Sequence, residues 1–344
     1  MKDNRYLIPF LGIITLVMVG FVLQVAQGVI LPLIIAWLLS YLFAPVVNFL
    51  ARHKVPTGMA VLAVLLIVVG FFYLVGMFVQ TRVMAFIGEY EAYAAQLTQI
   101  SVDIVEKFNL PESYFDEFDW TGKIGAYLVT LSGSFVSVAS NMGLILIFLV
   151  FMLLGKPYSQ RKIEAAFEDD RAQKITSVTN AITGQISRYL SIKVMISGVT
   201  AVLVWLVLVI MKVDFPLTWA AFTFLLNFIP TVGSVIATVP PVLLALIKCY
   251  GESFWPAVIV LILLLLIQQA MGSFIEPKLM GDSLNLSPVV ILLSLVFWGW
   301  LWGITGALLS VPIAAAIKIM CENIEALKPV SVMMGAGKVL PKKA

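Results

Sequence analysis

Seven long stretches of this sequence contain no Asp, Glu, Lys or Arg, and they limit the possible folds more than any other feature. A bilayer core is about 30 Å thick, so a helix that crosses it needs about 20 residues without ionised groups. The stretches are continuously apolar and lack the period-two alternation of barrel strands. We therefore expect an all-α, polytopic integral membrane protein. The stretches are 6–51, 55–81, 124–155, 194–211, 215–247, 253–275 and 283–317.

The lengths of the stretches predict how often the chain crosses the membrane. The first has 46 residues with Gln27-Gly28 in its middle, which is typical of two helices joined by a tight turn. The stretches 215–247 and 283–317 are too long for one pass and too short for two, since an unbroken helix of that length is a rod of about 50 Å. We expect six full transmembrane helices and two re-entrant hairpins, with eight plain spans as the alternative.

Both of these stretches are interrupted where a hairpin tip would lie, the first by proline and glycine at 227–234 and the second by glycines at 297–306. In each stretch two prolines are separated by 24 residues, which indicates a weak internal repeat. Because the single span 253–275 separates them, the hairpins would enter from opposite faces and meet near the midplane. The prolines at the ends and kinks of the hairpins are Pro216, Pro240, Pro241, Pro288 and Pro312.

Polar and small residues near these breaks are candidates for a substrate or ion path, because a polar side chain in hydrocarbon needs a partner or water. For Asn227 and the two glutamines, hydrogen bonding between helices is the alternative. For Glu276 and Lys278 the alternative is an interfacial pair that ends the span. The candidates are Asn227, Pro230, Gly233, Ser234, Gln268, Gln269, Glu276, Lys278, Gly299, Gly303, Gly306 and Ser310.

The charges of the loops predict the orientation of the chain. Residues 82–123 carry eight carboxylates against three bases, whereas the loops after the second and fourth spans are basic. The positive-inside rule then places both termini in the cytoplasm, as in a multi-pass protein of a bacterial cytoplasmic (inner) membrane. A heptad-like seam at 83–108 packs against its own domain or the bilayer, or it joins protomers of a homo-oligomer.

These features divide the chain into six segments. They are a three-helix membrane segment (1–81), an extracytoplasmic amphipathic helix with an acidic loop (82–123), the fourth span (124–155), a cytoplasmic amphipathic segment (156–193), a transport core with broken helices (194–320) and a cytoplasmic tail (321–344).

Several classes of function lack the residues they need. The sequence has one histidine and two cysteines without metal or redox spacing, so we expect no metal site and no catalytic triad. It has no phosphate loop and no dinucleotide fingerprint. We expect neither an enzyme nor a cofactor, and the partners are the lipid bilayer and a small solute rather than nucleic acid.

The motifs at the breaks resemble the autoinducer-2 exporter family of bacterial permeases. The similarity rests on Leu226–Ser234 with Pro240-Pro241, on Glu276–Gly281, and on Leu286–Pro288 through Leu308–Pro312. The resemblance implies a transporter of the cytoplasmic membrane that exports the autoinducer-2 quorum-sensing signal. Some family members resemble sodium- or lithium-proton antiporters.

Three functions follow as hypotheses. The first is secondary transport of a small polar molecule by alternating access. The second is Na⁺(Li⁺)/H⁺ antiport, with Glu276 or Asp282 exchanging a proton for the cation. The third is an oligomeric membrane scaffold that does not transport.

Overall fold

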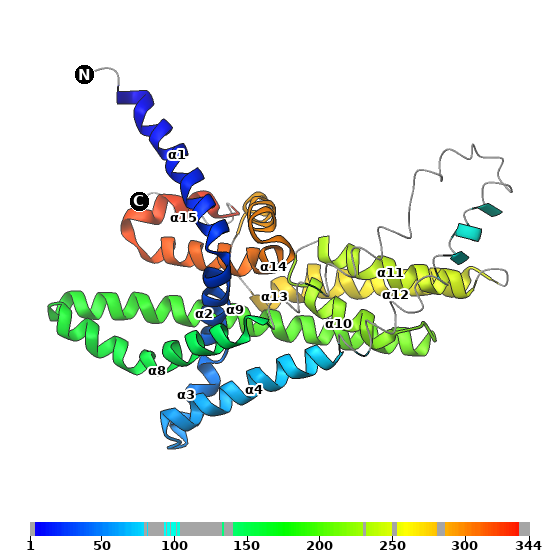
Figure 1. The fold of residues 1–344 in the computed structure, drawn as a ribbon, viewed down its shortest axis with the longest axis horizontal. Helices are drawn as coiled ribbons and strands as arrows, with labels where there is room; N and C mark the ends of the chain where they lie inside the picture. The colour runs from blue at the N-terminus through cyan, green and yellow to red at the C-terminus, as the bar shows by residue number, and fades with distance from the viewer. Residues whose placement is uncertain are drawn as a thin grey trace. The chain divides into compact units, whose positions relative to one another are not determined.

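A computed structural model of the chain is entirely helical in its regular elements over the part described (Figure 1). The structure describes residues 4–78, 81, 93, 95–96, 98–100, 102–103, 133, 140–229, 232–249, 253–280 and 286–336. Most of the predicted helix at 83–108 and all of the acidic loop lie outside these residues, so the proposed surface between protomers stays a prediction. The helices are α1 (Asn4–Val25), α2 (Gln27–Leu42), α3 (Ala44–Arg52), α4 (Thr57–Phe78), α8 (Met142–Ala166), α9 (Asp169–Ile210), α10 (Pro216–Leu226), α11 (Val232–Lys248), α12 (Trp255–Gln269), the π-helix η2 (Ala270–Ile275), α13 (Glu276–Met280), α14 (Pro288–Asn323), the 3-10 helix η4 (Glu325–Leu327) and α15 (Lys328–Met334).

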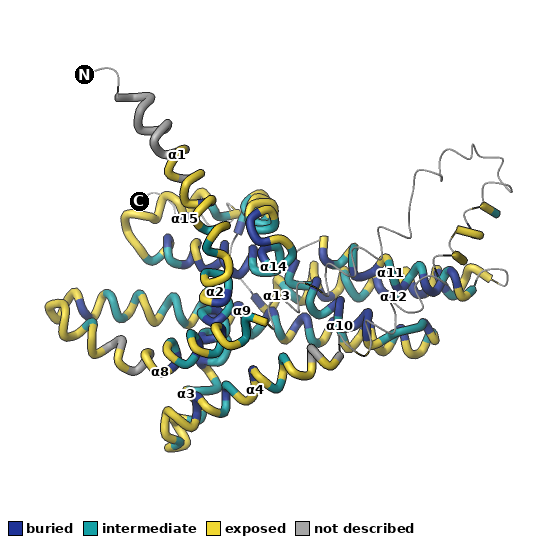
Figure 2. The backbone as a smooth tube through the Cα atoms, viewed as in Figure 1, coloured by how far each residue is buried: buried dark blue, intermediate teal, exposed yellow. Residues whose placement is uncertain are grey.

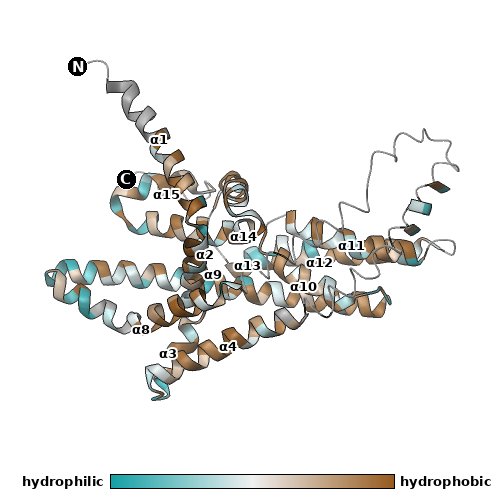
Figure 3. Cartoon of the chain, in the orientation of Figure 1, coloured by the Kyte–Doolittle hydropathy of each residue, from teal (hydrophilic) through white to brown (hydrophobic). Residues whose placement is uncertain are grey.

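The helices confirm an all-α polytopic membrane protein. By length and composition four of them could span a bilayer, although α14 among these is broken at Trp302 and Gly303, and α1 with α2 forms a further apolar pair bent by 89°. The chain breaks at Ala26, beside the turn predicted at Gln27-Gly28, but the 89° bend does not make the two helices antiparallel. Large apolar side chains such as Leu66, Phe151 and Ile210 are exposed. Exposed residues (Figure 2) and hydrophobic residues (Figure 3) both occur along the length of many helices. A soluble protein rarely exposes apolar surface on this scale, so these faces are suited to lipid. The four helices are Thr57–Leu74, Asp169–Ile210, Trp255–Met280 and Pro288–Asn323.

The chain forms two compact units, and α9 begins in one and ends in the other. In unit 1 (Met1–Leu66, Ser140–Arg188 and Asn285–Ala344), α2 packs against α8, α1 contacts α14, and α15 packs back on α14. In unit 2 (Ile67–Ala139 and Tyr189–Leu284), α10 packs on α11 and α11 on α12, which continues through η2 into α13.

Helix α9 joins two segments that the sequence analysis separates at residue 193. It runs without interruption for 42 residues, because no proline occurs between Asp169 and Ile210. Likewise α8 continues to Ala166, beyond the end of the predicted span at residue 155. The last turns of α8 and the first turns of α9, which follow each other in the chain, are hydrophilic (Figure 3).

The first predicted hairpin is present in unit 2 as α10 and α11. The two helices pack so closely that a Cβ atom added at Gly233 would lie 1.8 Å from the carbonyl oxygen of Leu226. Only a residue without a side chain allows this approach. The backbone arms therefore touch directly near the tip, while Pro230 at the tip lies outside the described residues.

The base of the first hairpin is held by a lysine at the end of α11. The Nζ of Lys248 donates to Oδ1 of Asp214 and to the carbonyl oxygen of Lys212, at 2.8 Å each. The hydroxyl of Tyr93 donates to the other Asp214 oxygen at 3.3 Å. Lys212 and Phe215 have positive φ angles of 53° and 54°, an unusual and strained conformation for residues other than glycine.

The second predicted hairpin is present in unit 1 within α14. The helix is interrupted at Trp302 and at Gly303, whose φ of 61° and ψ of −142° suit only glycine. Beyond the break the second arm folds back, because a Cβ at Gly306 would lie 1.9 Å from the carbonyl oxygen of Trp298. Four residues further along each arm, the Ser294 hydroxyl donates to the carbonyl oxygen of Ser310 at 2.8 Å.

The tip of the second hairpin is anchored in the core of unit 1. The indole Nε1 of Trp302 donates to the carbonyl oxygen of Leu23 at 3.2 Å, and its ring packs among residues of α1 and α2. The two helical hairpins are thus observed in the structure. Their re-entry into the bilayer from opposite faces stays a prediction.

An exposed ion pair connects the start of α9 to η4 in unit 1. The Nζ of Lys174 lies 2.9 Å from Oε1 of Glu325. The hydrogen bond from Lys174 and its positive charge, with a smaller effect of Lys328, lower the pKa of the Glu325 carboxyl. Any stabilisation from this pair is present above the ordinary carboxyl pKa and is lost as the pH falls through the lowered value. Solvent and salt screen the pair, so it contributes little.

Candidate functional site

One face of α9 in unit 2 carries four buried polar side chains. Tyr189, Lys193, Ser197 and Thr200 follow one another at intervals of four, four and three residues, which places them on the same side of the helix. Polar groups in an apolar interior are unfavourable unless they have partners. This face therefore needs partners from other helices or from a ligand, and it is the candidate site.

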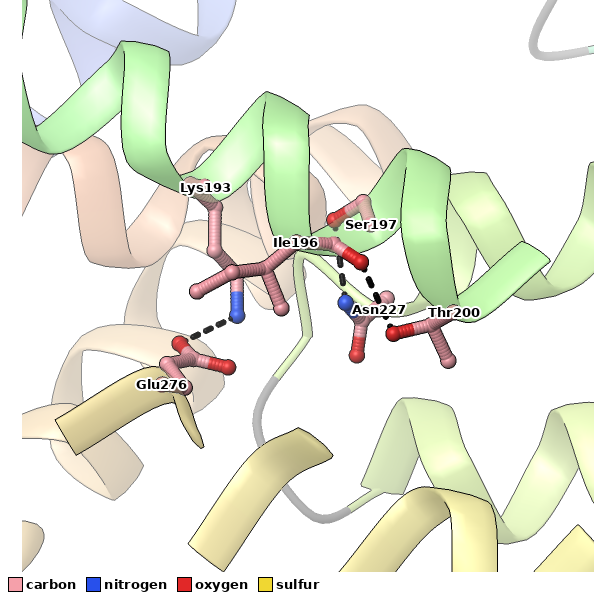
Figure 4. Close-up of polar contacts among 6 residues, drawn as sticks. All are labelled: Lys193, Ile196, Ser197, Thr200, Asn227 and Glu276. Atoms are coloured by element: carbon pink, nitrogen blue, oxygen red, sulfur yellow. Dashed lines mark hydrogen bonds and ion pairs between the residues drawn. The ribbon is translucent and has the colours of Figure 1, made fainter. Parts of the chain in front are cut away.

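Lys193 has its partner on α13. Its Nζ lies 2.6 Å from Oε1 of Glu276, and the side chains are only 5% and 21% exposed (Figure 4). A charge in such a setting is retained when an opposite charge and hydrogen bonds compensate it. The pair brings a charge of each sign to the site, and the two cancel.

Glu276 follows directly on a π-helical turn. The six residues of η2 separate α12 from α13, and Glu276 is the first residue after them. A π-helical turn has an i to i+5 hydrogen-bond pattern and changes the direction in which the following side chains point. The irregular turn thus determines where the Glu276 carboxylate lies, and such turns occur often at functional sites.

Asn227 connects the first hairpin to the same face of α9. It ends α10, and its Nδ2 donates to Oγ of Ser197 at 3.0 Å (Figure 4). Thr200, one turn further along α9, donates instead to the carbonyl oxygen of Ile196 at 2.8 Å. The ion pair and the end of the hairpin therefore contact the same polar face of α9, at Lys193 and at Ser197, which are four residues apart.

The hydrogen bond between Asn227 and Ser197 gives a testable prediction. Asn227→Ala and Ser197→Ala are each expected to lower the free energy of unfolding by about 1 kcal/mol, since each removes one buried hydrogen bond. The double variant should lose about 0.6 kcal/mol less than the sum, the usual coupling between helices in membranes. Unfolding of the purified protein in mixed micelles measures all three. Strictly additive losses would contradict a direct bond.

Tyr189 is the one of the four whose side chain lacks a partner. Its hydroxyl is buried and makes no hydrogen bond to the described residues. It lies one helical turn before Lys193 on the same face of α9. A buried hydroxyl without a bond is uncommon in native proteins, and this one is available to bond a water, an ion or a ligand group.

The other candidates from the sequence lie in different settings. Glu276 pairs with Lys193 and not with the exposed Lys278, so an interfacial pair of Glu276 with Lys278 is not what the structure shows. Gln268 is half-buried on α12 and Gln269 is exposed. Ser234 lies in the first turns of α11 and accepts a hydrogen bond from Thr238 at its carbonyl oxygen.

The candidates of the second hairpin belong to unit 1. Gly299, Gly303, Gly306 and Ser310 lie along the two arms of α14, and the Ser310 hydroxyl donates to the carbonyl oxygen of Ala307 at 2.7 Å. The convergence of both breaks on one transport site stays a prediction. Of the remaining candidates, Pro230 and Asp282 lie outside the described residues.

Sequence reasoning missed the polar face of α9. It assigned Lys193 to the basic residues that orient the chain, and it did not single out Ser197 or Thr200. The available signal was the regular spacing of polar residues from Tyr189 into an apolar span. That spacing indicates a site only once Glu276 and Asn227 are known to contact this face of α9.

Comparison with known proteins places the chain in a family. Residues 11–326 match the family described as AI-2E family transporter. A transport protein of Borreliella burgdorferi is 32% identical over 95% of this chain and 90% of its own length. The AI-2 transport protein TqsA of Escherichia coli is 29% identical over 95% of each chain. This chain therefore belongs to the AI-2E family of transporters.

Proposed function

We propose that the protein is a secondary transporter of the bacterial inner membrane that exports a small, polar, uncharged solute. Autoinducer-2 is the first candidate, because it is the molecule for which the relative TqsA is named. The observation that supports a neutral solute best is the face of α9, where the two charges of Lys193 and Glu276 cancel. Such a site offers hydroxyl, amide and charged partners without a net charge that would select an ion.

Alternating access requires a part of the protein that changes position around the site. The hairpin of α10 and α11 is that part in our proposal, because Asn227 at the end of α10 touches the polar face of α9. Movement of the hairpin would break the bond to Ser197 and free both side chains for the solute. Solute binding and hairpin movement would thus compete for the same polar groups.

Uptake into inverted membrane vesicles tests this proposal. Vesicles that contain the protein are expected to take up labelled autoinducer-2 saturably, and Asn227→Ala is expected to reduce uptake by about tenfold, because it removes a polar contact to the solute. Asn323→Ala is the matched control, since the Asn323 amide donates within its own helix, to the carbonyl oxygen of Ile319 at 2.8 Å. Equal loss in both variants, or no uptake by folded wild-type protein, would reject the proposal.

The position of Glu276 weakens the antiport alternative. A sodium or lithium site needs carboxylate and carbonyl oxygens that are free to bind the cation, whereas Glu276 is held by Lys193 at 2.6 Å. Vesicles carrying the wild-type protein are therefore expected to keep their pH gradient when sodium or lithium is added. Collapse of the gradient would restore antiport as the leading function.

A further inference from the structure

The connection between α9 and α10 contains a carboxylate whose two oxygens are both bonded. Oδ1 of Asp214 accepts a hydrogen bond from Nζ of Lys248 at 2.8 Å, and Oδ2 accepts one from the hydroxyl of Tyr93 at 3.3 Å. The Lys248 ammonium also donates to the carbonyl oxygen of Lys212 at 2.8 Å. We call Asp214, Lys248 and Tyr93 the Asp214 clasp. All three belong to unit 2, and they join the two ends of the first hairpin to a third segment of the chain.

Tyr93 connects the clasp to the heptad-like seam at 83–108. Tyr93 and Ile100 lie seven residues apart on this seam. The ring of Tyr93 lies edge-on to that of Phe215, with 6.4 Å between the ring centroids, and Ile100 is buried. At these two described positions the seam is covered by its own chain, which favours packing within the protein over a contact between protomers.

The clasp holds a strained stretch of backbone on both sides. Lys212 and Phe215 have φ angles of 53° and 54°, in the left-handed region that residues with a side chain disfavour. The clasp bonds the carbonyl oxygen of Lys212 and the side chain of Asp214, which directly precedes Phe215. Such angles persist only where the surroundings impose them. When the clasp opens, the connection can return to ordinary angles, and α10 then leaves α9 in a different direction.

We propose that Asp214, Lys248 and Tyr93 are positioning residues, which hold the first hairpin in the position described and so control how often it moves. The inference rests on the transport function proposed above and adds the residues that control its moving part. The clasp lies beyond the end of α9, about 20 Å along the helix from Ser197, so it acts through the hairpin. Because Tyr93 lies in the segment predicted to be extracytoplasmic, the clasp acts from that side.

The exposure of the clasp suits a contact that must open. The side chains of Lys248 and Asp214 are 47% and 36% exposed, so water can replace each partner and no charge is left unpaired in a dry interior. A single exposed ion pair contributes little. Here, however, the ammonium has two acceptors and the carboxylate two donors. The clasp therefore favours one position of the hairpin without fixing it permanently.

Opening of the clasp would make the polar face of α9 available to solute. Asn227 at the end of α10 is bonded to Ser197 in the closed position. If α10 changes direction at its start, its end moves as well and this bond breaks. Only the released fraction of the protein then binds solute, so the closed clasp lowers the apparent affinity.

Cysteine labelling measures this release directly and needs no solute. Thr200 is fully buried on the polar face, and Thr200→Cys places a thiol there. In the full chain with Cys249→Ser and Cys321→Ser, reconstituted in liposomes, N-ethylmaleimide should label this thiol slowly. Lys248→Met keeps the length of the side chain but removes both of its bonds, so labelling should become about tenfold faster. Tyr93→Phe removes one longer bond and should accelerate labelling about threefold.

Two further variants separate release of the hairpin from damage to the fold. Lys212→Gly should slow labelling by about threefold, because glycine adopts the left-handed angle without strain and the closed position becomes more stable. A general loss of stability cannot slow labelling. Lys248→Arg keeps a cation with several donors and should label within about twofold of the parent protein.

Two controls lie in unit 1. Lys174→Met breaks another exposed ion pair, with Glu325 at 2.9 Å, and should leave labelling of the Thr200→Cys thiol unchanged. Ser310→Cys, in place of Thr200→Cys, puts the thiol at a position that is buried in unit 1. That thiol should stay slow in every variant, because it reports unfolding and not movement of the first hairpin.

Solute binding gives a second measurement in the same liposomes. The half-saturating concentration for exchange of labelled autoinducer-2 should fall in Lys248→Met, by up to about tenfold, and should rise in Lys212→Gly. Equal labelling of Lys248→Met and its parent, or faster labelling of Lys212→Gly, overturns the role of the clasp and leaves the transport function standing. Absence of saturable exchange in folded wild-type protein overturns the transport function, while the labelling rates still decide whether the clasp holds the hairpin.

Discussion

Glu276→Ala is expected to lower the free energy of unfolding by about 3–5 kcal/mol. The substitution leaves the Lys193 ammonium, whose side chain is only 5% exposed, without its counter-charge. Loss of one partner from a buried pair has effects of this size, because the remaining charge keeps its desolvation penalty. Unfolding of purified protein in mixed micelles of mild and denaturing detergent measures the difference.

The converse variants test the cause. Lys193→Ala should have a smaller effect than Glu276→Ala, because Glu276 is 21% exposed and water can solvate the carboxylate that remains. The double variant Lys193→Met with Glu276→Met should regain most of the stability, since well-packed apolar residues often replace a buried pair without loss. A double variant that loses as much stability as the two single variants together would show that the charges do not stabilise each other.

Gly233→Ala and Gly306→Ala are each expected to disrupt their hairpin, with a loss of about 3 kcal/mol or more. A methyl group at either position would lie within 2 Å of a backbone carbonyl oxygen, at Leu226 or at Trp298. Backbone cannot move aside as a flexible side chain can, so the effect lies at or above the upper end of overpacking. The same unfolding assay measures it, and transport should fall in parallel.

Gly299→Ala is the matched control for both glycines. It lies on the same helix as Gly306, but the nearest atom to its added methyl is Cβ of Ala307 at 3.8 Å, an ordinary contact. Alanine is a better helix former than glycine, so this variant should be neutral or gain up to about 1 kcal/mol. Similar losses at Gly299 and Gly306 would show that the helical arms do not touch as the structure has them.

The sequence was most informative where the type of a single residue determines the backbone conformation. Glycine and proline correctly indicated the turn after α1, the first hairpin and the break at Gly303, because these residues restrict or permit backbone angles wherever they occur. Charge-free stretches correctly predicted an all-helical membrane protein. They could not locate helix ends, since α8 and α9 continue through charged residues once they leave the apolar segment.

The candidate site was only partly predictable, because it depends on contacts between distant residues. Asn227 and Glu276 were identified from the neighbouring breaks, but their partners Ser197 and Lys193 were not. A lysine at the end of an apolar span looks the same in sequence whether it faces the cytoplasm or a buried carboxylate. The π-helical turn that aims Glu276 has no reliable sequence signal either.

The direct contact of backbone with backbone near the tip of the first hairpin has a mechanical consequence. Gly233 and Leu226 leave no side chain between the arms that could rearrange, so α10 and α11 should move as one rigid lever and not by opening at the end. The hinge of that movement then lies at the base of the hairpin, between α9 and α10. There Lys212 and Phe215 have unfavourable backbone angles, and the bonds of Lys248 to Asp214 and to Lys212 hold the connecting residues in place.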